Sequence, residues 1–262
     1  MRVFDTGRLI PLSSMSTSKG NQRKWYEPEK KLYIKEQFWY QGKYWRDDLV
    51  ECIAAGIAEQ MNTGSVVVIK QKPCMICENG IYRHGVYSAD FTSGDKRFVS
   101  LYRLLAINRM EYEMTNSVEA NWYFVRNFLN RFLETDITEY LLVMSLLDYL
   151  LGNEDRHLNN LGLLESNHLF IQAPLFDFGL GLFEHDRRYE GESFRKCLQL
   201  MQCKPFASDN QELMNFLVKE YDINQYIPPK LDLSEYEIPS PKAGSYLRNR
   251  CLQLGIKLKG VD

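Results

Sequence analysis

The sequence predicts an α+β protein of two lobes, a small β-rich lobe at the N-terminus and a mainly helical lobe after it. Segments that alternate between polar and apolar residues dominate roughly the first 90 residues, and they surround one amphipathic helix. From about residue 100 onward the apolar residues follow helical spacing instead. A chain of 262 residues has room for one or two domains of roughly 100–200 residues each. We therefore expect one lobe over residues 1–88 and another over residues 89–262.

Three predicted strands give the N-terminal lobe its β-rich character. Residues 31–40, KLYIKEQFWY, alternate and are rich in aromatic side chains, and residues 65–70, SVVVIK, and 83–91 carry similar strand signals. Between the first two strands, residues 47–61 place their apolar side chains at helical spacing. The polar and basic residues 12–24, which precede the first strand, are typical of a loop.

Two helices and a hairpin define the larger lobe. Residues 118–132 show one apolar helical face, and residues 138–151 are more apolar still, which predicts a helix at the centre of the lobe. Gly152 directly after this second helix is a typical helix stop. Residues 161–164 and 168–171 then predict two strands of a hairpin.

Composition excludes several classes of protein. The 32 basic residues against 34 acidic ones give a net charge of −2, which argues against a protein that coats nucleic acid. We find no secretory signal and no membrane span, and the six cysteines are then expected to be free thiols in a reducing cytosol. Cytoplasmic location is the resulting expectation, with export by a signal-independent route as the alternative.

One stretch, residues 152–181, carries three polar side chains at a spacing typical of phosphoryl transfer. It reads GNEDRHLNNLGLLESNHLFIQAPLFDFGLG, where Asn160 follows Asp155 by five positions and Asp177 opens an Asp-Phe-Gly turn. One carboxylate can orient an attacking hydroxyl and accept its proton, while an amide oxygen and a second carboxylate hold magnesium against nucleotide phosphates. The stretch therefore predicts a phosphotransferase that uses ATP and Mg²⁺.

Groups for the nucleotide side of such a site occur earlier in the chain. Lys35 lies in the middle of the first predicted strand, from which a lysine can reach the α- and β-phosphates if a carboxylate holds it. Glu51, early in the next helix, is the expected carboxylate. The Ser- and Gly-containing residues 13–20 are expected to close over phosphates with backbone N–H groups and hydroxyls.

The stretch around Asp155 resembles the catalytic loop and metal-binding turn of the HipA-like kinases, which share Asp-x-His-x-x-Asn with phosphoinositide kinases. The resemblance extends over most of the chain and implies the two-lobed fold of protein kinases. It implies that Asp155 is the catalytic base, that Asn160 and Asp177 bind magnesium, and that His157 lies close to the nucleotide. The strand lysine and its helix partner match the phosphate-binding pair of the family.

The resemblance also suggests how adenine is held. Residues 86–91, VYSADF, would form the hinge between the lobes and give backbone hydrogen bonds to the base. Within the hinge, Tyr87 and Ala89 would lie near adenine and Asp90 near the ribose. These matches are looser than those at the catalytic loop.

A regulatory serine in the phosphate loop is a further property that the resemblance implies. Autophosphorylation of this serine expels the loop and blocks ATP binding in the family. Ser13, Ser14, Ser16 and Ser18 lie in the matching region, with Ser16 and Ser18 assigned to the nucleotide site. HipA toxins also carry a small N-terminal subdomain, and the early position of Lys35 leads us to expect that this chain lacks it or receives it from a partner chain. An antitoxin is the other partner that the family suggests.

The expected activity is transfer of the γ-phosphoryl group to a Ser or Thr of a protein, with autophosphorylation, and without nucleic-acid or membrane partners. A nucleotide-binding pseudokinase and a phosphoinositide-type kinase are the alternatives. The charges after Asp177 are mixed, which favours a protein substrate over a lipid headgroup. His157, His168, His185 and Asp186 prompt a third alternative, a metal-dependent phosphohydrolase, although four histidines in the whole chain are few for such a site.

Overall fold

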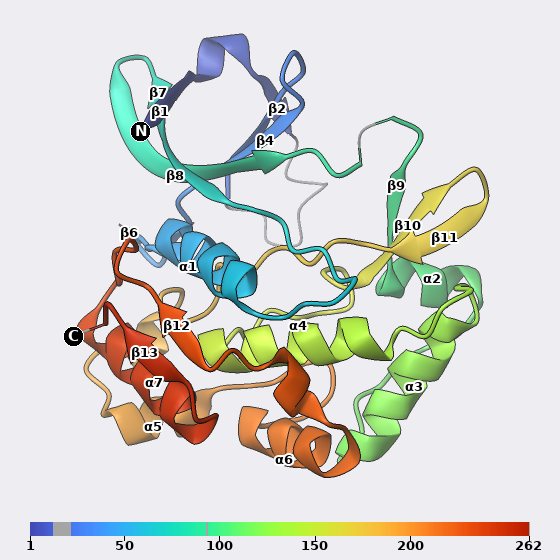
Figure 1. Cartoon of the computed structure of the whole chain (residues 1–262). Coiled ribbons are helices and arrows are strands. Elements are labelled where there is room, and N and C mark those ends of the chain that lie inside the picture. Colours follow the sequence, from blue (N-terminus) through green and yellow to red (C-terminus); the bar gives the residue numbers. More distant parts are fainter. Residues whose placement is uncertain (13–21, 93, 262) are drawn as a thin grey trace.

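The computed structural model describes residues 1–12, 22–92 and 94–261 of the chain. A strongly curved sheet forms the upper lobe in Figure 1, and a group of helices forms the lower lobe. Helix α1 (Asp47–Gln60) lies between the two. The predicted two-lobed α+β architecture is therefore confirmed, whereas the division between residues 88 and 89 remains a prediction.

The upper lobe is built on a six-stranded sheet with the order β1-β7-β8-β4-β3-β2. Strands β1 and β7 pair in parallel, and the other neighbours pair antiparallel. Phe4, Trp25, Ile34 and Ile76 form a small buried cluster that supports the sheet. The strands are β1 (Arg2–Asp5), β2 (Ile10–Leu12), β3 (Lys24–Glu27), β4 (Leu32–Glu36), β7 (Lys72–Glu78) and β8 (Ile81–Ala89).

The first predicted strand is shorter than the pattern of residues 31–40 suggested. It ends at Glu36, because Phe38 N donates to Asp47 Oδ1 at 2.7 Å instead of to a neighbouring strand. The aromatic residues that follow form the short hairpin of β5 (Trp39–Tyr40) and β6 (Lys43–Tyr44). The alternation of polar and apolar residues in the sequence therefore continues beyond the point where the strand ends.

The second predicted strand, residues 65–70, is wrong. This segment leaves α1 and runs beside the chain that leads into Asp177, where Leu175 N donates to Val67 O at 2.8 Å and Ile69 N donates to Leu175 O at 2.9 Å. Only an isolated bridge between Val68 and Leu175 results. The strand that follows α1 in the sheet is instead β7, which starts two residues after this segment. It pairs antiparallel with β8 over its whole length.

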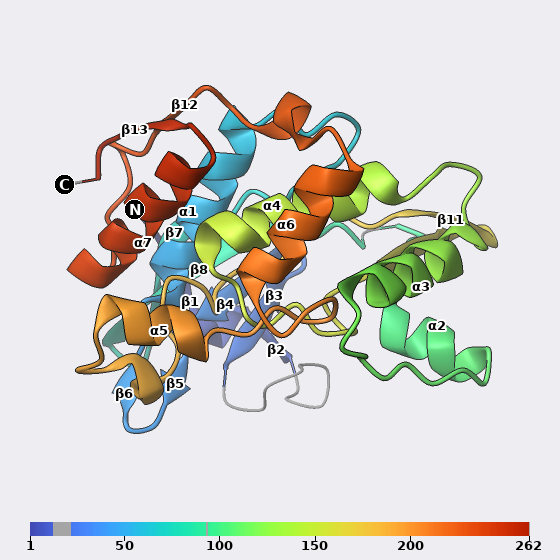
Figure 2. The same ribbon diagram turned by 90° about the horizontal axis from the view of Figure 1, so that it is seen from below.

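The lower lobe begins with a small three-stranded sheet in the order β11-β10-β9 and continues with helices. From below, α4 crosses the centre of the lobe behind α6, with α2 and α3 on one side and α5 and α7 on the other (Figure 2). The elements are β9 (Arg97–Ser100), α2 (Leu101–Ile107), α3 (Val118–Asn130), α4 (Thr138–Leu151), β10 (Gly162–Ser166), β11 (Leu169–Gln172), α5 (Phe194–Leu200), α6 (Asn210–Glu220), β12 (Lys230–Asp232), α7 (Pro241–Gln253) and β13 (Lys257–Lys259).

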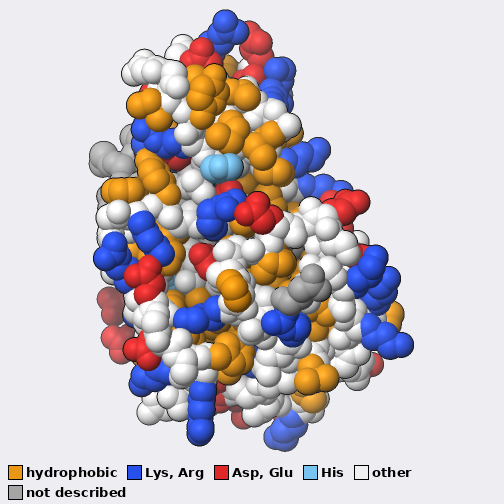
Figure 3. Space-filling model, turned by 90° about the vertical axis from the view of Figure 1, so that its left-hand side faces the viewer, with side chains coloured by type: hydrophobic (Ala, Val, Ile, Leu, Met, Phe, Trp, Pro, Cys, Tyr) orange, Lys and Arg blue, Asp and Glu red, His pale blue; other side chains and the backbone are white. Residues whose placement is uncertain are grey.

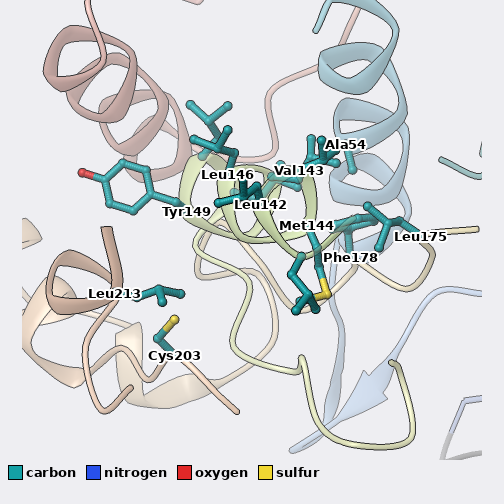
Figure 4. Close-up of a cluster of buried hydrophobic side chains, with 14 of the residues drawn as sticks. Ala54, Leu142, Val143, Met144, Leu146, Tyr149, Leu175, Phe178, Cys203 and Leu213 are labelled. Atoms are coloured by element: carbon teal, nitrogen blue, oxygen red, sulfur yellow. The ribbon is translucent and has the colours of Figure 1, made fainter. Parts of the chain in front are cut away.

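Helix α4 is the centre of the core. All of its residues from Tyr140 to Leu151 are buried, as expected for a helix that is apolar on every side. Figure 4 shows Val143 and Met144 of α4 between Ala54 of α1 and Phe178, which follows Asp177. The central helix therefore supports both the α1 side of the cleft and the segment that carries Asp177.

A left-handed glycine ends α4 and starts the loop that carries Asp155. Gly152 has φ +60°, and a Cβ at this position would lie 2.4 Å from Met201 Cε and 2.9 Å from Tyr246 Cζ. Glycine is required there both by its conformation and by the close packing. None of the helices in the described part of the chain is long and apolar enough to cross a membrane.

Candidate active site

Three charged side chains from distant parts of the sequence come together in the structure, with Lys35 at their centre. Its Nζ lies 2.7 Å from Glu51 Oε1 and 2.7 Å from Asp177 Oδ1. Strand β4 supplies the lysine, α1 supplies the glutamate, and the loop after β11 supplies the aspartate. The structure therefore joins the two residues predicted on the nucleotide side to one of those predicted on the catalytic side.

The ion pair between Lys35 and Asp177 holds these two groups in their charged forms. Burial alone would lower the pKa of Lys35, but Asp177 and Glu51 outweigh it and the pKa lies well above its ordinary value. Burial would likewise raise the pKa of Asp177, yet Lys35 and then Lys24 bring it below the usual range. A carboxylate that is ionised at all moderate pH values is suited to hold a divalent cation.

The backbone at Asp177 is held in an unusual conformation from two sides. Asp177 has φ +61°, a region that residues other than glycine seldom adopt. On one side Glu51 Oε2 accepts a hydrogen bond from Phe178 N at 3.1 Å. On the other, Arg156 Nη1 donates to Phe176 O at 2.9 Å. The two bonds flank Asp177 and fix the direction of its side chain.

A buried ion pair beneath Asp155 connects the two acidic loops. Arg156 is 1% exposed, and its Nε and Nη2 bind the two carboxylate oxygens of Asp148 at 2.9 and 3.0 Å. Asn153 Nδ2 also donates to Asp148 Oδ1 at 2.7 Å. Asp148 is the one charged side chain in the apolar stretch of α4 after Glu139. A lone acid in such a stretch is a signal in the sequence that a basic partner is buried beside it. The pair fixes the loop from α4 to Asn160.

Replacing Arg156 by leucine is expected to lower the free energy of unfolding by about 3 kcal/mol, because Asp148 would remain charged and buried without its partner. Chemical denaturation by urea measures the change. Arg97, whose ion pair with Glu165 is exposed, provides the control, since Arg97→Leu should cost less than about 1 kcal/mol. Equal losses in the two variants would contradict the structural role given to Arg156.

The loop after α4 places Asp155, His157 and Asn160 together. Asn160 is buried, and its Nδ2 donates to Asp155 O at 2.9 Å. His157 Nδ1 accepts from Asn159 N at 3.1 Å, so the ring proton is on Nε2, which lies 3.8 Å from Asp155 Oδ2. The backbone of Asp155 is thus fixed by Asn160, and the ring of His157 lies beside its carboxylate.

Two adjoining cavities lie in front of these groups. The larger has a volume of about 330 Å³, a size that suits a small-molecule ligand. One end is apolar and aromatic, and the other is charged; its lining residues are Leu12, Lys24, Tyr33, Ile34, Lys35, Glu51, Ile69, Gln71, Ser88, Phe91, Phe176 and Asp177. A smaller cavity of about 20 Å³ shares Lys24, Lys35 and Asp177 with the first and adds Asp155. Asp155 and Asp177 therefore line adjoining cavities that share the two lysines.

Solved structures match the fold of this chain, although no protein-family profile and no curated protein sequence matches it. The proinflammatory kinase CtkA of Helicobacter pylori aligns at a TM-score of 0.58 and 15% identity, over 96% of this chain and 93% of that chain. This chain has a two-lobed kinase fold. The HipA protein of Shewanella oneidensis MR-1, solved with HipB and operator DNA, aligns at a TM-score of 0.49 and 12% identity, over 94% of this chain and 65% of that chain. The likeness to CtkA is a likeness of fold, and it agrees with the kinase fold that the sequence predicted.

The segment predicted as the hinge, residues 86–91, covers the end of β8 and the two residues after it. Asp90 directly follows the strand, and its carboxylate accepts from Tyr26 OH at 3.1 Å and from Thr92 N at 2.8 Å. Ala89 is exposed, and the ring of Tyr87 packs against Phe4 on the other face of the sheet. The side chain of Tyr87 is therefore directed away from the cavity, which leaves only its backbone to face a ligand.

Ser88 and Phe91, which belong to the predicted hinge but were given no role of their own, line the larger cavity. The ring of Phe91 packs against that of Phe176 in a tilted arrangement at a centroid distance of 5.2 Å, and Phe176 directly precedes Asp177. The predicted loop serines Ser13, Ser14, Ser16 and Ser18 lie outside the described residues. Their assignment to the nucleotide site remains a prediction.

A buried aspartate at the start of α1 is a further group that the sequence did not reveal. Asp47 is 2% exposed, accepts from Phe38 N at 2.7 Å and from Gln22 Nε2 at 2.7 Å, and lines the smaller cavity. Burial raises its pKa from 3.8 to about 7, although Lys35 and the Phe38 N–H act in the opposite direction. Asp47 therefore binds a proton in the folded protein at pH values where the unfolded chain has lost it.

Asp47 should make the protein less stable as the pH rises from about 4 to about 7. Within this window the folded state binds more protons than the unfolded state, so the free energy of unfolding falls by up to about 4 kcal/mol. Asp47→Asn retains the acceptor for Phe38 N and removes the titration, and we expect it to flatten this slope in urea unfolding between pH 4 and pH 8. An unchanged slope would contradict the raised pKa of Asp47.

The segment after Asp177 is tied to the catalytic loop through Glu154. This buried carboxylate lies 2.9 Å from His185 Nε2 and 2.6 Å from Arg188 Nη2, and it also binds Tyr189 OH. His185 is thus a structural partner of Glu154, while His168 is exposed at the hairpin turn. Among the described residues no group of three or more His, Cys, Asp or Glu side chains is placed to hold a metal ion. The arrangement offers no support for the phosphohydrolase alternative.

Proposed function

We propose that this protein is an ATP- and Mg²⁺-dependent protein kinase that transfers the γ-phosphoryl group to Ser or Thr residues. The observation that carries the proposal is the convergence of Lys35, Glu51 and Asp177 at a cavity that also reaches Asp155. A lysine held by a helix carboxylate, next to an acid for metal and an acid for the hydroxyl, is the arrangement that phosphoryl transfer from a nucleotide requires.

The cavity fits a nucleotide at both ends. Tyr33, Phe91 and Phe176 offer flat apolar surfaces for a base, and Ser88 lies on the strand that leads into the hinge. At the charged end, the ammonium of Lys35 binds the α- and β-phosphates while Glu51 keeps it in place. The hinge backbone around residues 87–90 would hydrogen-bond the adenine, with Asp90 near the ribose.

Asp177 and Asn160 are the residues that would hold magnesium, which neutralises phosphate charge as the bond to the leaving oxygen breaks. The lowered pKa of Asp177 and the hard oxygen donors of the two side chains suit this cation. Asn160 donates through its amide nitrogen to Asp155 O, which leaves the amide oxygen as the atom that can accept a ligand. Arg156 fixes the loops that carry both residues, because its Nη1 donates to Asn160 O and to the O of Phe176, which directly precedes Asp177.

Asp155 performs the proton step. Its carboxylate accepts a hydrogen bond from the hydroxyl of the substrate and directs one oxygen lone pair at the γ-phosphorus. As the new oxygen–phosphorus bond forms and the bond to the β-phosphate oxygen breaks, the hydroxyl proton passes to Asp155 and ADP leaves. His157 Nε2–H, 3.8 Å from Asp155 Oδ2, is placed to donate a hydrogen bond beside that carboxylate.

A protein substrate is favoured by the mixed charge around the segment after Asp177. In this segment Arg188 and Arg187 lie within 3.9 Å of Asp186 and Glu190, so their charges are already compensated. Figure 3 shows basic side chains interspersed with acidic and apolar ones on the face that carries β6, α5 and α7. A phosphoinositide headgroup would be bound better by a continuous basic surface.

The test is incubation of the purified protein with γ-labelled ATP, magnesium and a mixture of acceptor proteins, followed by phosphoamino-acid analysis. Label on serine or threonine, from the protein itself or an acceptor, is the expected result. Label on vesicles that contain phosphoinositides, with none on protein, would identify the alternative kinase. ATP binding without any transfer would favour the pseudokinase. A partner chain or an antitoxin remains a prediction that co-purification would test.

A further inference from the structure

Glu154 directly precedes Asp155 but lies outside the nucleotide cleft. It lines neither of the two cavities, and its side chain is only 6% exposed. Burial alone would raise its pKa, but His185, Tyr189 and Arg188 outweigh that effect and bring the pKa below its ordinary value. A buried carboxylate is costly unless it is well paired. Glu154 is therefore suited to anchor other groups rather than to exchange a proton.

The carboxylate of Glu154 binds both ends of one segment, residues 180–202, which follows Asp177. Three side chains near the start of the segment bind Oε2; they belong to His185, Arg188 and Tyr189. Near the end of the segment, Gln202 N donates to Oε1 at 2.8 Å. One side chain thus closes the segment into a loop beside the catalytic residue.

The same segment borders the place where transfer would occur. Leu180, at its start, lines the smaller cavity together with Asp155. The backbone joins the two elements as well, because Glu154 N donates to Leu180 O at 3.3 Å. A hydroxyl group that reaches Asp155 has to enter this cavity, so the acceptor protein has to lie against the residues that follow Leu180.

The upper lobe contacts the other side of the segment. Arg187 N donates to Gln41 Oε1 at 3.0 Å, and Lys43 forms an ion pair with Glu190. Gln41 and Lys43 belong to the β5–β6 hairpin. The ion pair is exposed, and exposed pairs contribute little to stability. The buried carboxylate of Glu154 is therefore the stronger of the two attachments.

We propose that Glu154 is a positioning residue, which fixes residues 180–202 against the catalytic loop and thereby shapes the surface that receives the acceptor protein. This inference rests on the function proposed above. Glu154 touches neither the nucleotide nor the acceptor hydroxyl and acts only through the segment. Its loss should therefore weaken acceptor binding and leave ATP binding and the chemistry at Asp155 in place.

The first measurement is limited proteolysis, because four sites for trypsin lie in the segment; they are Arg187, Arg188, Arg195 and Lys196. Glu154→Gln should be cut there at least about tenfold faster than the wild type, since hydrogen bonds to a charged group are lost. Tyr189→Phe removes one buried hydroxyl and should increase the rate by a smaller factor. Glu139→Gln, at a carboxylate of α4 that accepts from Ser65 N and Oγ, is the matched control and should leave the rate unchanged.

The second measurement is transfer of labelled phosphate to dephosphorylated casein as the acceptor. Glu154→Gln should raise the KM for casein about tenfold, while kcat and the Kd for ATP change less than about threefold. A general loss of structure would lower kcat and ATP affinity as well. Tyr189→Phe should change the same constant in the same direction, which keeps the test decisive if Glu154→Gln does not fold.

The outcomes separate the claims. Cleavage of Glu154→Gln and Tyr189→Phe at the wild-type rate would overturn the anchoring of the segment. Faster cleavage with an unchanged KM for casein would overturn the role toward the acceptor, as would a loss confined to kcat. Wild-type protein that labels no acceptor would overturn the proposed function, and the trypsin result would still decide whether Glu154 fixes the segment.

Discussion

Replacing Asp177 by asparagine is expected to lower the rate of phosphoryl transfer at least about 1000-fold, which corresponds to roughly 4 kcal/mol of lost transition-state stabilisation. Asparagine removes the charge that would hold magnesium and that pairs with Lys35 at 2.7 Å. It is the appropriate replacement because Asp177 has φ +61°, a conformation that asparagine tolerates better than alanine. Initial rates with labelled ATP measure the effect.

Asp95, an exposed acid whose carboxylate accepts from Ser166 Oγ at 2.6 Å, provides the control for Asp177→Asn. Asp95→Asn should retain the wild-type rate, and both variants should unfold cooperatively. The magnesium dependence of ATP binding should also be lost in Asp177→Asn alone. A variant at Asp177 that kept more than a tenth of the wild-type rate would show that the metal is held elsewhere.

Asp155→Asn is expected to reduce kcat by about 100- to 10,000-fold while the affinity for ATP changes less than about threefold. Asparagine has nearly the same shape but cannot take the proton of the attacking hydroxyl. Asp155 lines the smaller cavity rather than the larger one, which explains why nucleotide binding should survive its loss. The split between kcat and Kd separates this residue from Asp177, whose loss should affect both.

Steady-state rates and calorimetry on the same preparation of Asp155→Asn would measure both quantities. An unchanged kcat would remove Asp155 from the chemistry. A large loss of ATP affinity would instead assign it to binding.

The sequence predicted those parts of the fold in which local pattern and tertiary packing agree. The range of α4, Thr138–Leu151, was predicted to the residue, because a helix that is apolar all round and ends in glycine has few alternatives. Residues 65–70 misled for the opposite reason. Their β-branched residues suit a strand, but in the structure this segment packs beside Leu175 and makes only an isolated bridge. The strand that pairs with β8 is β7.

The same distinction applies to the site. Spacing along one stretch was enough to single out Asp155, Asn160 and Asp177, and strand and helix patterns were enough for Lys35 and Glu51, which the structure joins by an ion pair. Groups that owe their importance to burial were missed. The raised pKa of Asp47, the buried pairing of Arg156 with Asp148, and the position of Lys24 opposite Lys35 arise only from tertiary packing and strand pairing.

The most direct test of the account is a calorimetric titration of the wild-type protein with ATP, with and without magnesium, because it requires no knowledge of the acceptor. We expect saturable binding that magnesium strengthens, and we expect Lys35→Met, which removes the ammonium between Glu51 and Asp177, to weaken it at least about tenfold. Wild-type protein that binds no ATP under either condition, while folded, would contradict the assignment of this cleft to nucleotide chemistry.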